Sequence, residues 1–234
     1  MISALLLGLL LGMRHAMESD HVAAVATLTA NSPSLQRSLL LGAVWGLGHT
    51  ATLLAVCTAV LLADAAIPTQ VAHVLEGAVG VMLLALGIDL LRRLRRARIH
   101  VHAHTHTGAS LHLHVHSHRG EAQPHAIVHR HEHPRGFPVR ALAIGMMHGM
   151  AGSAALMVVA FAHFASTLSG LAYVAVFGAG SIAGMALLSL AIAVPLRWSS
   201  KSFGWLHHLL QGAAALCAIG IGAALVAEQA VLLV

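Results

Sequence analysis

Six long apolar stretches dominate this chain and constrain its fold more than any other feature. A helix that crosses the hydrocarbon of a bilayer needs roughly 20 mostly apolar residues, and each stretch meets or exceeds that length. The pattern therefore predicts an all-α polytopic membrane protein with six transmembrane helices. The stretches lie at about 2–30, 38–63, 71–92, 138–166, 169–195 and 204–232.

Composition excludes the main soluble classes of protein. Of the 234 residues, 58% are hydrophobic and only 9% are charged, whereas about a quarter of a soluble domain is charged. Most of the basic residues lie in one connecting segment, so no basic face for nucleic acid is indicated. Cys57 and Cys217 both lie in apolar stretches, which indicates neither a disulfide framework nor a Cys-x-x-Cys metal site. We expect no enzymatic activity, no catalytic residues and no prosthetic group.

A polar segment at 93–137 separates two expected membrane domains, 1–92 and 138–234. It begins with the arginine cluster that starts at Arg92 and runs to Arg98, and it holds twelve of the twenty histidines. Because it has too few large apolar residues to form a core, we expect it to be disordered. The arginines are expected to contact anionic lipid. The histidines are expected to buffer metal or pass it to a cytosolic metallochaperone, or else to form a nonessential linker.

The basic residues between the stretches predict the orientation of the chain. Arg37 lies in the first connection, the arginine cluster in the third, and Arg197 and Lys201 in the fifth. Under the positive-inside rule these three connections face the cytoplasm. The sequence therefore predicts a protein of the cytoplasmic membrane with both termini outside and the histidine-rich segment inside.

The two membrane domains share a weak internal repeat. Residues 11–17 (LGMRHAM) parallel residues 144–150 (IGMMHGM) at an offset of 133 residues. Residues 75–78 (LEGA) parallel 210–213 (LQGA) at nearly the same offset. Because each copy would hold three helices, an odd number, the second copy would enter the membrane from the opposite face. The pattern predicts a 3+3 inverted repeat, a plan that transporters use around a site near the membrane midplane.

Five ionisable residues lie within eight positions of the first apolar stretch: Arg14, His15, Glu18, Asp20 and His21. Ionisable side chains are costly inside a bilayer and are candidates for function by default. Imidazole and carboxylate together suit a divalent first-row metal such as nickel, cobalt or zinc. The alternative is an ion pair between Arg14 and Glu18, with the histidines as hydrogen-bonded core residues.

Helix geometry limits how this cluster can hold an ion. At about 100° per residue, His15 and Asp20 point roughly 140° apart on a straight helix, so one unbroken helix cannot aim both at a single ion. We expect either that the helix unwinds around residues 15–21 or that Asp20 orients a ligand histidine through its second ring nitrogen.

Two further histidines lie at a similar expected depth, His49 in the second stretch and His148 in the fourth, although each could instead be a core residue. The candidate metal ligands are therefore His15, Glu18, Asp20, His21, His49 and His148.

Two motifs resemble the nickel/cobalt transporter (NiCoT) family. The first is Arg14-His15-Ala16 with His15, Asp20 and His21 in His-x4-Asp-His spacing, and the second is Gly48-His49-Thr50. The motifs cover residues 11–53, about a fifth of the chain. The resemblance implies a permease in which His15, Asp20 and His21 bind and select the ion. Better-known permeases of the family have eight helices and a later acidic-threonine motif, so this chain looks like a shorter relative, similar also to membrane proteins encoded beside urease genes.

The sequence predicts a secondary transporter that moves Ni²⁺ or Co²⁺ by transient coordination. A divalent cation gains about 4.6 kcal/mol from an inside-negative potential of about 100 mV, which favours uptake. The alternatives are an exporter of the same superfamily and a membrane protein that stores or senses metal through its histidine-rich segment. A thiol-redox protein is disfavoured because Cys57 and Cys217 do not occupy equivalent places in the two halves.

Overall fold

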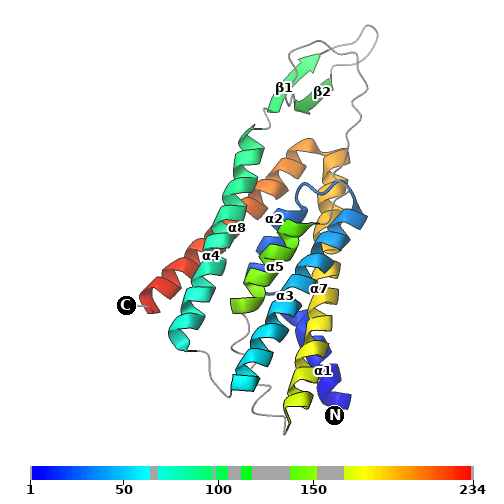
Figure 1. Ribbon diagram of the computed structural model, residues 1–234. Coiled ribbons are helices and arrows are strands. Elements are labelled where there is room, and N and C mark those ends of the chain that lie inside the picture. The colour runs from blue at the N-terminus through cyan, green and yellow to red at the C-terminus, as the bar shows by residue number, and fades with distance from the viewer. Residues whose placement is uncertain are drawn as a thin grey trace.

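The computed structural model of the protein describes residues 2–63, 68–96, 99–104, 112–117, 138–151 and 166–232. These residues are helical except for one two-stranded sheet. The elements are α1 (Ile2–His15), α2 (Ser19–Thr29), α3 (Leu35–Ala63), α4 (Thr69–Arg96), β1 (Ile99–His104), β2 (His112–Ser117), α5 (Val139–Ala151), α7 (Thr167–Ser202) and α8 (Gly204–Leu232). Figure 1 shows the helices as one elongated bundle, with the two strands beyond the end of α4.

Four of these helices, α3, α4, α7 and α8, are long and apolar enough to cross a membrane. Large apolar side chains on them are exposed, among them Leu47, Val81, Leu187 and Leu216. A bilayer would cover such a surface, which a water-soluble monomer rarely carries. The structure therefore has the predicted character of an α-helical integral membrane protein.

The first apolar stretch forms two helices, not the single spanning helix that its hydropathy predicted. α1 ends at His15 and α2 begins at Ser19. In the turn between them, the backbone N–H groups of Met17 and Glu18 donate to the carbonyls of Arg14 and His15. The expected unwinding is confirmed, and it lies between the two histidines of the His-x4-Asp-His motif.

Two predicted boundaries near basic residues also change. α4 continues past residue 92 to Arg96, so much of the arginine cluster is helical. Pro195, expected near the end of its helix, lies inside α7. A proline within a membrane helix is tolerated where neighbouring groups satisfy the carbonyl that it leaves free.

Part of the histidine-rich segment differs from the expected disorder. β1 and β2 pair antiparallel, with His100 opposite His116, His102 opposite His114 and His104 opposite His112. The physical reason lies in the spacing, because histidines that alternate with apolar residues match the two-residue period of a strand. Residues 105–111 and 118–137 lie outside the described part of the chain.

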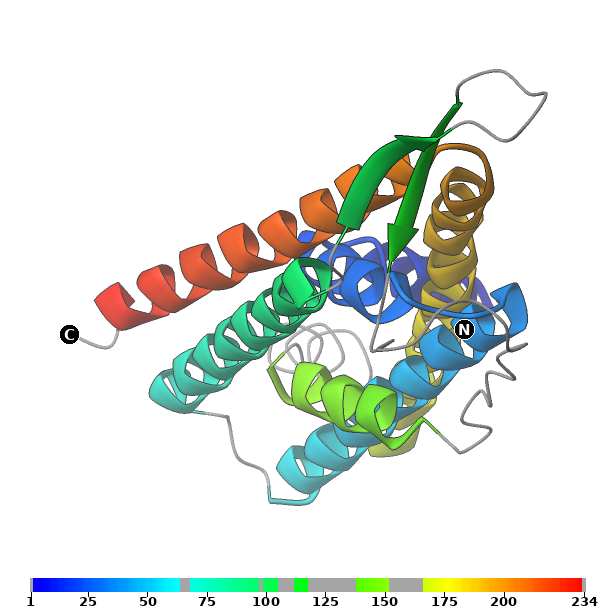
Figure 2. The same ribbon diagram turned by 90° about the horizontal axis from the view of Figure 1, so that it is seen from above.

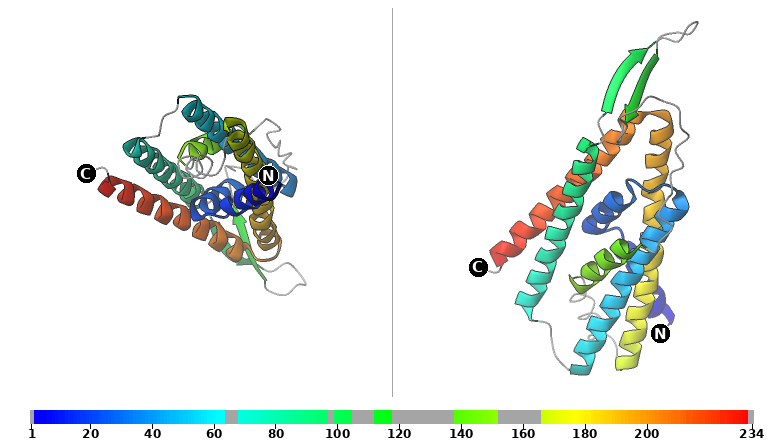
Figure 3. Two further views of the ribbon diagram at one scale, coloured as in Figure 1. Left: turned by 90° about the horizontal axis from the view of Figure 1, so that it is seen from below. Right: turned by 45° about the horizontal axis from the view of Figure 1, so that its top comes forward.

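The long helices pack in two pairs around two short ones. α3 packs against α7, and α4 packs against α8. α2 contacts α7 and α8, whereas α5 contacts α3 and α4. Seen from above and from below, α2 and α5 lie between the α3–α7 pair and the α4–α8 pair (Figures 2 and 3). The ends of the short helices therefore lie inside the bundle, where their polar side chains are shielded from lipid.

Candidate metal site

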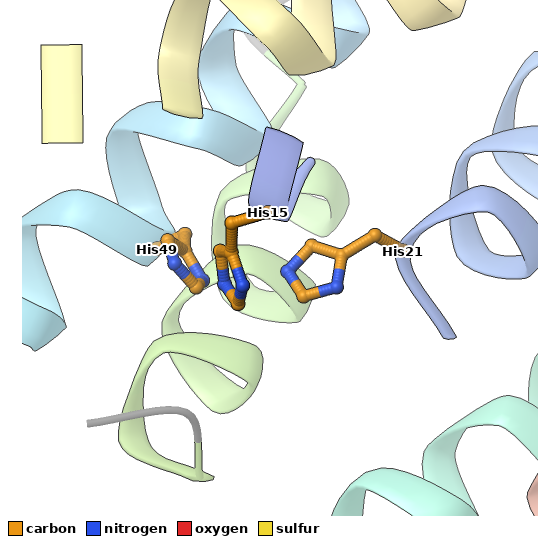
Figure 4. Close-up of side chains that lie close together, drawn as sticks. All are labelled: His15, His21 and His49. Atoms are coloured by element: carbon orange, nitrogen blue, oxygen red, sulfur yellow. The ribbon is translucent and has the colours of Figure 1, made fainter. Parts of the chain in front are cut away.

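Three histidines from three helices meet inside the bundle. His15 is the last residue of α1, His21 lies in α2 just after the turn, and His49 lies in the middle of α3. Figure 4 shows their rings pointing toward one another. The ring centroids are 4.5 Å apart for His15 and His21, 5.2 Å for His15 and His49, and 5.4 Å for His21 and His49. We call these three residues the histidine triad.

His21 and His49 are buried, His15 is partly buried, and the facing nitrogens of all three lack hydrogen-bond partners in the described part of the chain. His21 and His49 are 2% and 0% exposed. Nε2 of His15, Nε2 of His21 and both ring nitrogens of His49 have no partner among the described residues. Leaving buried polar atoms unpaired costs free energy. One metal ion could bind three of these four nitrogens, one from each ring. One ligand atom from each residue lies within 4.8 Å of the others, so a small contraction would bring them to one ion.

Two carboxylates orient the histidines of the triad. His15 Nδ1 lies 3.0 Å from Glu18 Oε1, and His21 Nδ1 lies 2.9 Å from Asp20 Oδ1. Because an ionised carboxylate can only accept, each Nδ1 is the donor and each Nε2 keeps its lone pair. Carboxylates hold the ligand histidines of many metal sites in this way. Asp20 thus has the orienting contact that the helix geometry suggested.

His148 approaches the same aspartate from α5. Its Nε2 donates to Asp20 Oδ2 at 2.9 Å, and its ring centroid lies 4.5 Å from that of His21. Asp20, His21 and His148 form a second group whose ligand atoms lie within 4.8 Å of one another. All six residues predicted as candidate ligands therefore come together, although they come from four helices and the turn.

The sequence left two other interpretations open, an ion pair between Arg14 and Glu18 and hydrogen-bonded core histidines. Glu18 contacts His15, and no ion pair between Glu18 and Arg14 is found in the described part of the chain. His148 has the hydrogen bond of a satisfied core histidine on one ring nitrogen, but its Nδ1 has no partner within the described ranges. His49 has no such bond on either nitrogen.

Two aromatic residues that the sequence analysis did not select complete the surroundings. Trp45 lies 5.4 Å from the ring of His21 and 5.5 Å from that of His148, and Phe177 lies 5.4 Å from the ring of His15. Trp45 precedes His49 by four residues and so shares its helix face, a signal that could have identified it. Phe177 carries no such signal.

A cavity of about 180 Å³ opens beside the cluster. It is lined by three carboxylates, Glu18, Asp20 and Glu76, together with His15, His21 and His148. His49 is not among the lining residues and lies behind them. We call this space the acidic cavity.

A second cavity of about 220 Å³ lies nearer the arginine-rich end of α4. Arg37, Arg93, Arg140 and Asp89 line it, and we call it the basic cavity. Asp89 Oδ2 accepts from Arg93 at 3.1 Å and from Arg140 at 2.9 Å. Arg93 lies one turn further along α4, whereas Arg140 comes from α5.

Other histidines have separate roles in packing. His73 Nδ1 lies 2.7 Å from Gln229 Oε1, and His207 Nδ1 lies 3.0 Å from the carbonyl of Leu196. His163 lies outside the described residues.

Comparison with known proteins gives one relative of similar length. Over 207 residues the chain is 35% identical to the urease accessory protein UreH of Bacillus sp. (strain TB-90), covering 86% of this chain and 81% of that protein. No family profile matches the chain, and no solved structure does. Since the identity extends over most of both proteins, the chain belongs to the family of the urease accessory protein UreH.

Proposed function

We propose that this protein is a secondary permease that imports Ni²⁺ across the cytoplasmic membrane, with the histidine triad as its central binding position. The observation that carries the proposal is the set of buried, unpartnered imidazole nitrogens next to a cavity lined by carboxylates. Imidazole nitrogens suit borderline divalent ions such as nickel and cobalt. The absence of thiolates from both groups disfavours a site for copper(I).

The NiCoT-like motifs favour nickel as the cargo, because they carry four of the six candidate ligands. The relative is named as an accessory protein of urease. Cobalt has nearly the same ligand preferences, so it is the second cargo to test.

The placement of the two cavities along α4 supports uptake. Glu76 and Val79 line the acidic cavity, whereas Asp89 and Arg93, further along the same helix, line the basic one. Under the positive-inside rule the arginine-rich end of α4 faces the cytoplasm. The acidic cavity then opens toward the outside, where it would collect cations that the membrane potential draws inward.

Paired close contacts between helices support the 3+3 inverted repeat. At each of six glycines, an added Cβ would collide with a backbone carbonyl of a neighbouring helix. The six contacts form three pairs, whose members are related by offsets of 132 to 135 residues. A two-fold axis between the halves would generate each contact from its partner. The pairs are Gly12–Phe177 with Gly145–Trp45, Gly48–Leu142 with Gly180–Leu9, and Gly87–Ala215 with Gly222–Gly80.

Uptake of radioactive nickel by cells that express the protein tests the proposal. We expect accumulation to rise with the wild type and to fall at least tenfold in His15→Ala. His73→Ala is the matched control, because His73 is also a histidine in a membrane helix but contacts Gln229 away from the cluster.

Three other outcomes separate the alternatives. Unchanged accumulation in His15→Ala would contradict the ligand assignment. Lower accumulation with the wild type than without it would indicate export. Complete loss of function on deletion of residues 99–134 would favour a storage or sensing protein, whereas a permease should remain active with lower affinity.

A further inference from the structure

His21 belongs to two groups of potential metal ligands at once. One is the histidine triad, and the other is Asp20, His21 and His148. The ring of His21 lies at the same centroid distance, 4.5 Å, from His15 and from His148. The His-x4-Asp-His motif is therefore divided, with His15 in one group, Asp20 in the other and His21 in both.

We propose that Asp20, His21 and His148 form a second ion position, which the cargo occupies before it moves to the histidine triad. We call it the capture position. The inference rests on the proposed function, because it takes a divalent transition-metal ion as the cargo, and it assigns to His148 the role of a ligand.

Two of the distances between donors are close to those around an octahedral ion, and all three donors lie within 4.8 Å of one another. His21 Nδ1 and His148 Nε2 each lie 2.9 Å from an oxygen of Asp20. For metal–ligand bonds of about 2.1 Å, neighbouring ligands at right angles lie about 3 Å apart. Two imidazoles and a carboxylate are also a set that leaves room for water on a first-row metal. The hydrogen bonds to Asp20 therefore hold these donors close to the separation that an ion would require.

The ring chemistry of His21 makes the two positions mutually exclusive. A neutral imidazole has one N–H and one lone pair. Nδ1 of His21 faces Asp20, whereas Nε2 points toward His15 (Figure 4). When Nδ1 holds an ion at the capture position, the ring proton is on Nε2, which then cannot serve the triad. As the ion moves on, the proton returns to Nδ1 and is again donated to Asp20. Each ring keeps its single proton, and the chain holds one ion at a time.

The acidic cavity sets the order of the two positions. All three residues of the capture position line it, whereas the triad contributes only His15 and His21 to its lining. His49 does not line it and is 0% exposed. An ion from the cavity therefore reaches the complete capture position before it reaches the complete triad. The carboxylate of Asp20 would offset part of the ion's charge while water is removed.

Purified full-length protein with Co²⁺ as the probe tests the capture position, since the visible absorption of Co²⁺ reports its coordination. We expect the wild type to bind one Co²⁺ per chain more than His21→Ala, which lacks both ion positions but keeps the histidine-rich segment. His49→Ala should still bind Co²⁺, with the weak absorption of a six-coordinate, oxygen-containing site. His148→Gln should keep the spectrum of the triad but lose at least tenfold in nickel transport into proteoliposomes. The glutamine can still donate to Asp20, but its amide is a poor ligand.

Several results would overturn the inference. If His148→Gln transports nickel at the wild-type rate, His148 is a positioning residue only. If the wild type binds two Co²⁺ per chain more than His21→Ala, the exclusive use of His21 is contradicted. If His49→Ala binds no more Co²⁺ than His21→Ala, there is no capture position. His148→Asn is the second variant if the glutamine variant does not fold, with His73→Ala as the control. A wild type that binds no more Co²⁺ than His21→Ala and does not transport nickel would instead overturn the proposed function.

Discussion

The acidic and the basic cavity lie along the same helix and differ in charge and in polar partners. Three carboxylates and three histidines line the acidic cavity, whereas three arginines and Asp89 line the basic one. Between them along α4 lies an apolar layer that includes Met82 and Leu83, of which Leu83 is fully buried. From this difference in charge we expect a cation to be attracted on one side of the layer and repelled on the other.

The two cavities also differ in how many of their titratable groups already have partners. Around the acidic cavity, several ring nitrogens of the histidines remain without partners in the described part of the chain. At the basic cavity, Asp89 already has two guanidinium partners, both more than a third exposed. The first region therefore has nitrogen donors left over for a further ligand, whereas the carboxylate of the second already has its partners.

The largest effect is expected from His21→Ala, because His21 is shared by both ion positions. We expect nickel uptake to fall to background, about 100-fold or more below the wild type, because both the histidine triad and the capture position lose a ligand. The measurement is the initial rate of uptake, with elution in size-exclusion chromatography as the test of folding. If folded His21→Ala takes up nickel normally, the acidic cavity does not carry the ion and the two cavities do not differ in function.

A smaller but still large effect is expected from Asp20→Asn. The change keeps the shape of the side chain but removes its charge and one acceptor oxygen, so His21 and His148 lose part of their orientation. Loss of an orienting carboxylate typically lowers metal affinity about 10- to 100-fold. The affinity for Co²⁺ by titration checks this. An affinity within twofold of the wild type would show that Asp20 neither orients His21 nor binds the ion.

Glu76→Gln should have a moderate effect that depends on salt. Glu76 lines the acidic cavity but belongs to neither ligand group. We expect a rise in KM for nickel of about 2- to 10-fold at low ionic strength, through weaker attraction of the cation, and a smaller rise at about 0.15 M salt. Equal effects at both salt concentrations would argue for direct coordination by Glu76.

The smallest effect is expected from Asp89→Asn in the basic cavity. Exposed ion pairs contribute about 1 kcal/mol or less to stability, so Tm should change by only a few degrees and uptake by less than about twofold. Thermal unfolding and the uptake assay check both. A large rise in uptake or in passive leak would indicate that the Asp89–Arg140 contact closes the cytoplasmic end. The two cavities would then differ in gating as well as in charge.

Sequence reasoning located the polar cluster because hydropathy is a local property. Glu18 and Asp20 are conspicuous in an apolar stretch without any knowledge of their neighbours. The same reasoning gave the wrong extent for the first helix, since an apolar average cannot show where backbone hydrogen bonds change partners. It also did not select Phe177, whose contact with His15 joins residues far apart in the chain.

The sequence by itself determined that this chain enters a membrane, and it determined which polar side chains must be accommodated there. Both follow from the cost of placing apolar groups in water and charged groups in lipid. Only the tertiary structure decided that the rings of His49 and His148 both lie close to that of His21 and that Asp20 contacts two imidazoles. Those contacts depend on how closely the helices approach one another, and that distance is set by packing across the whole bundle.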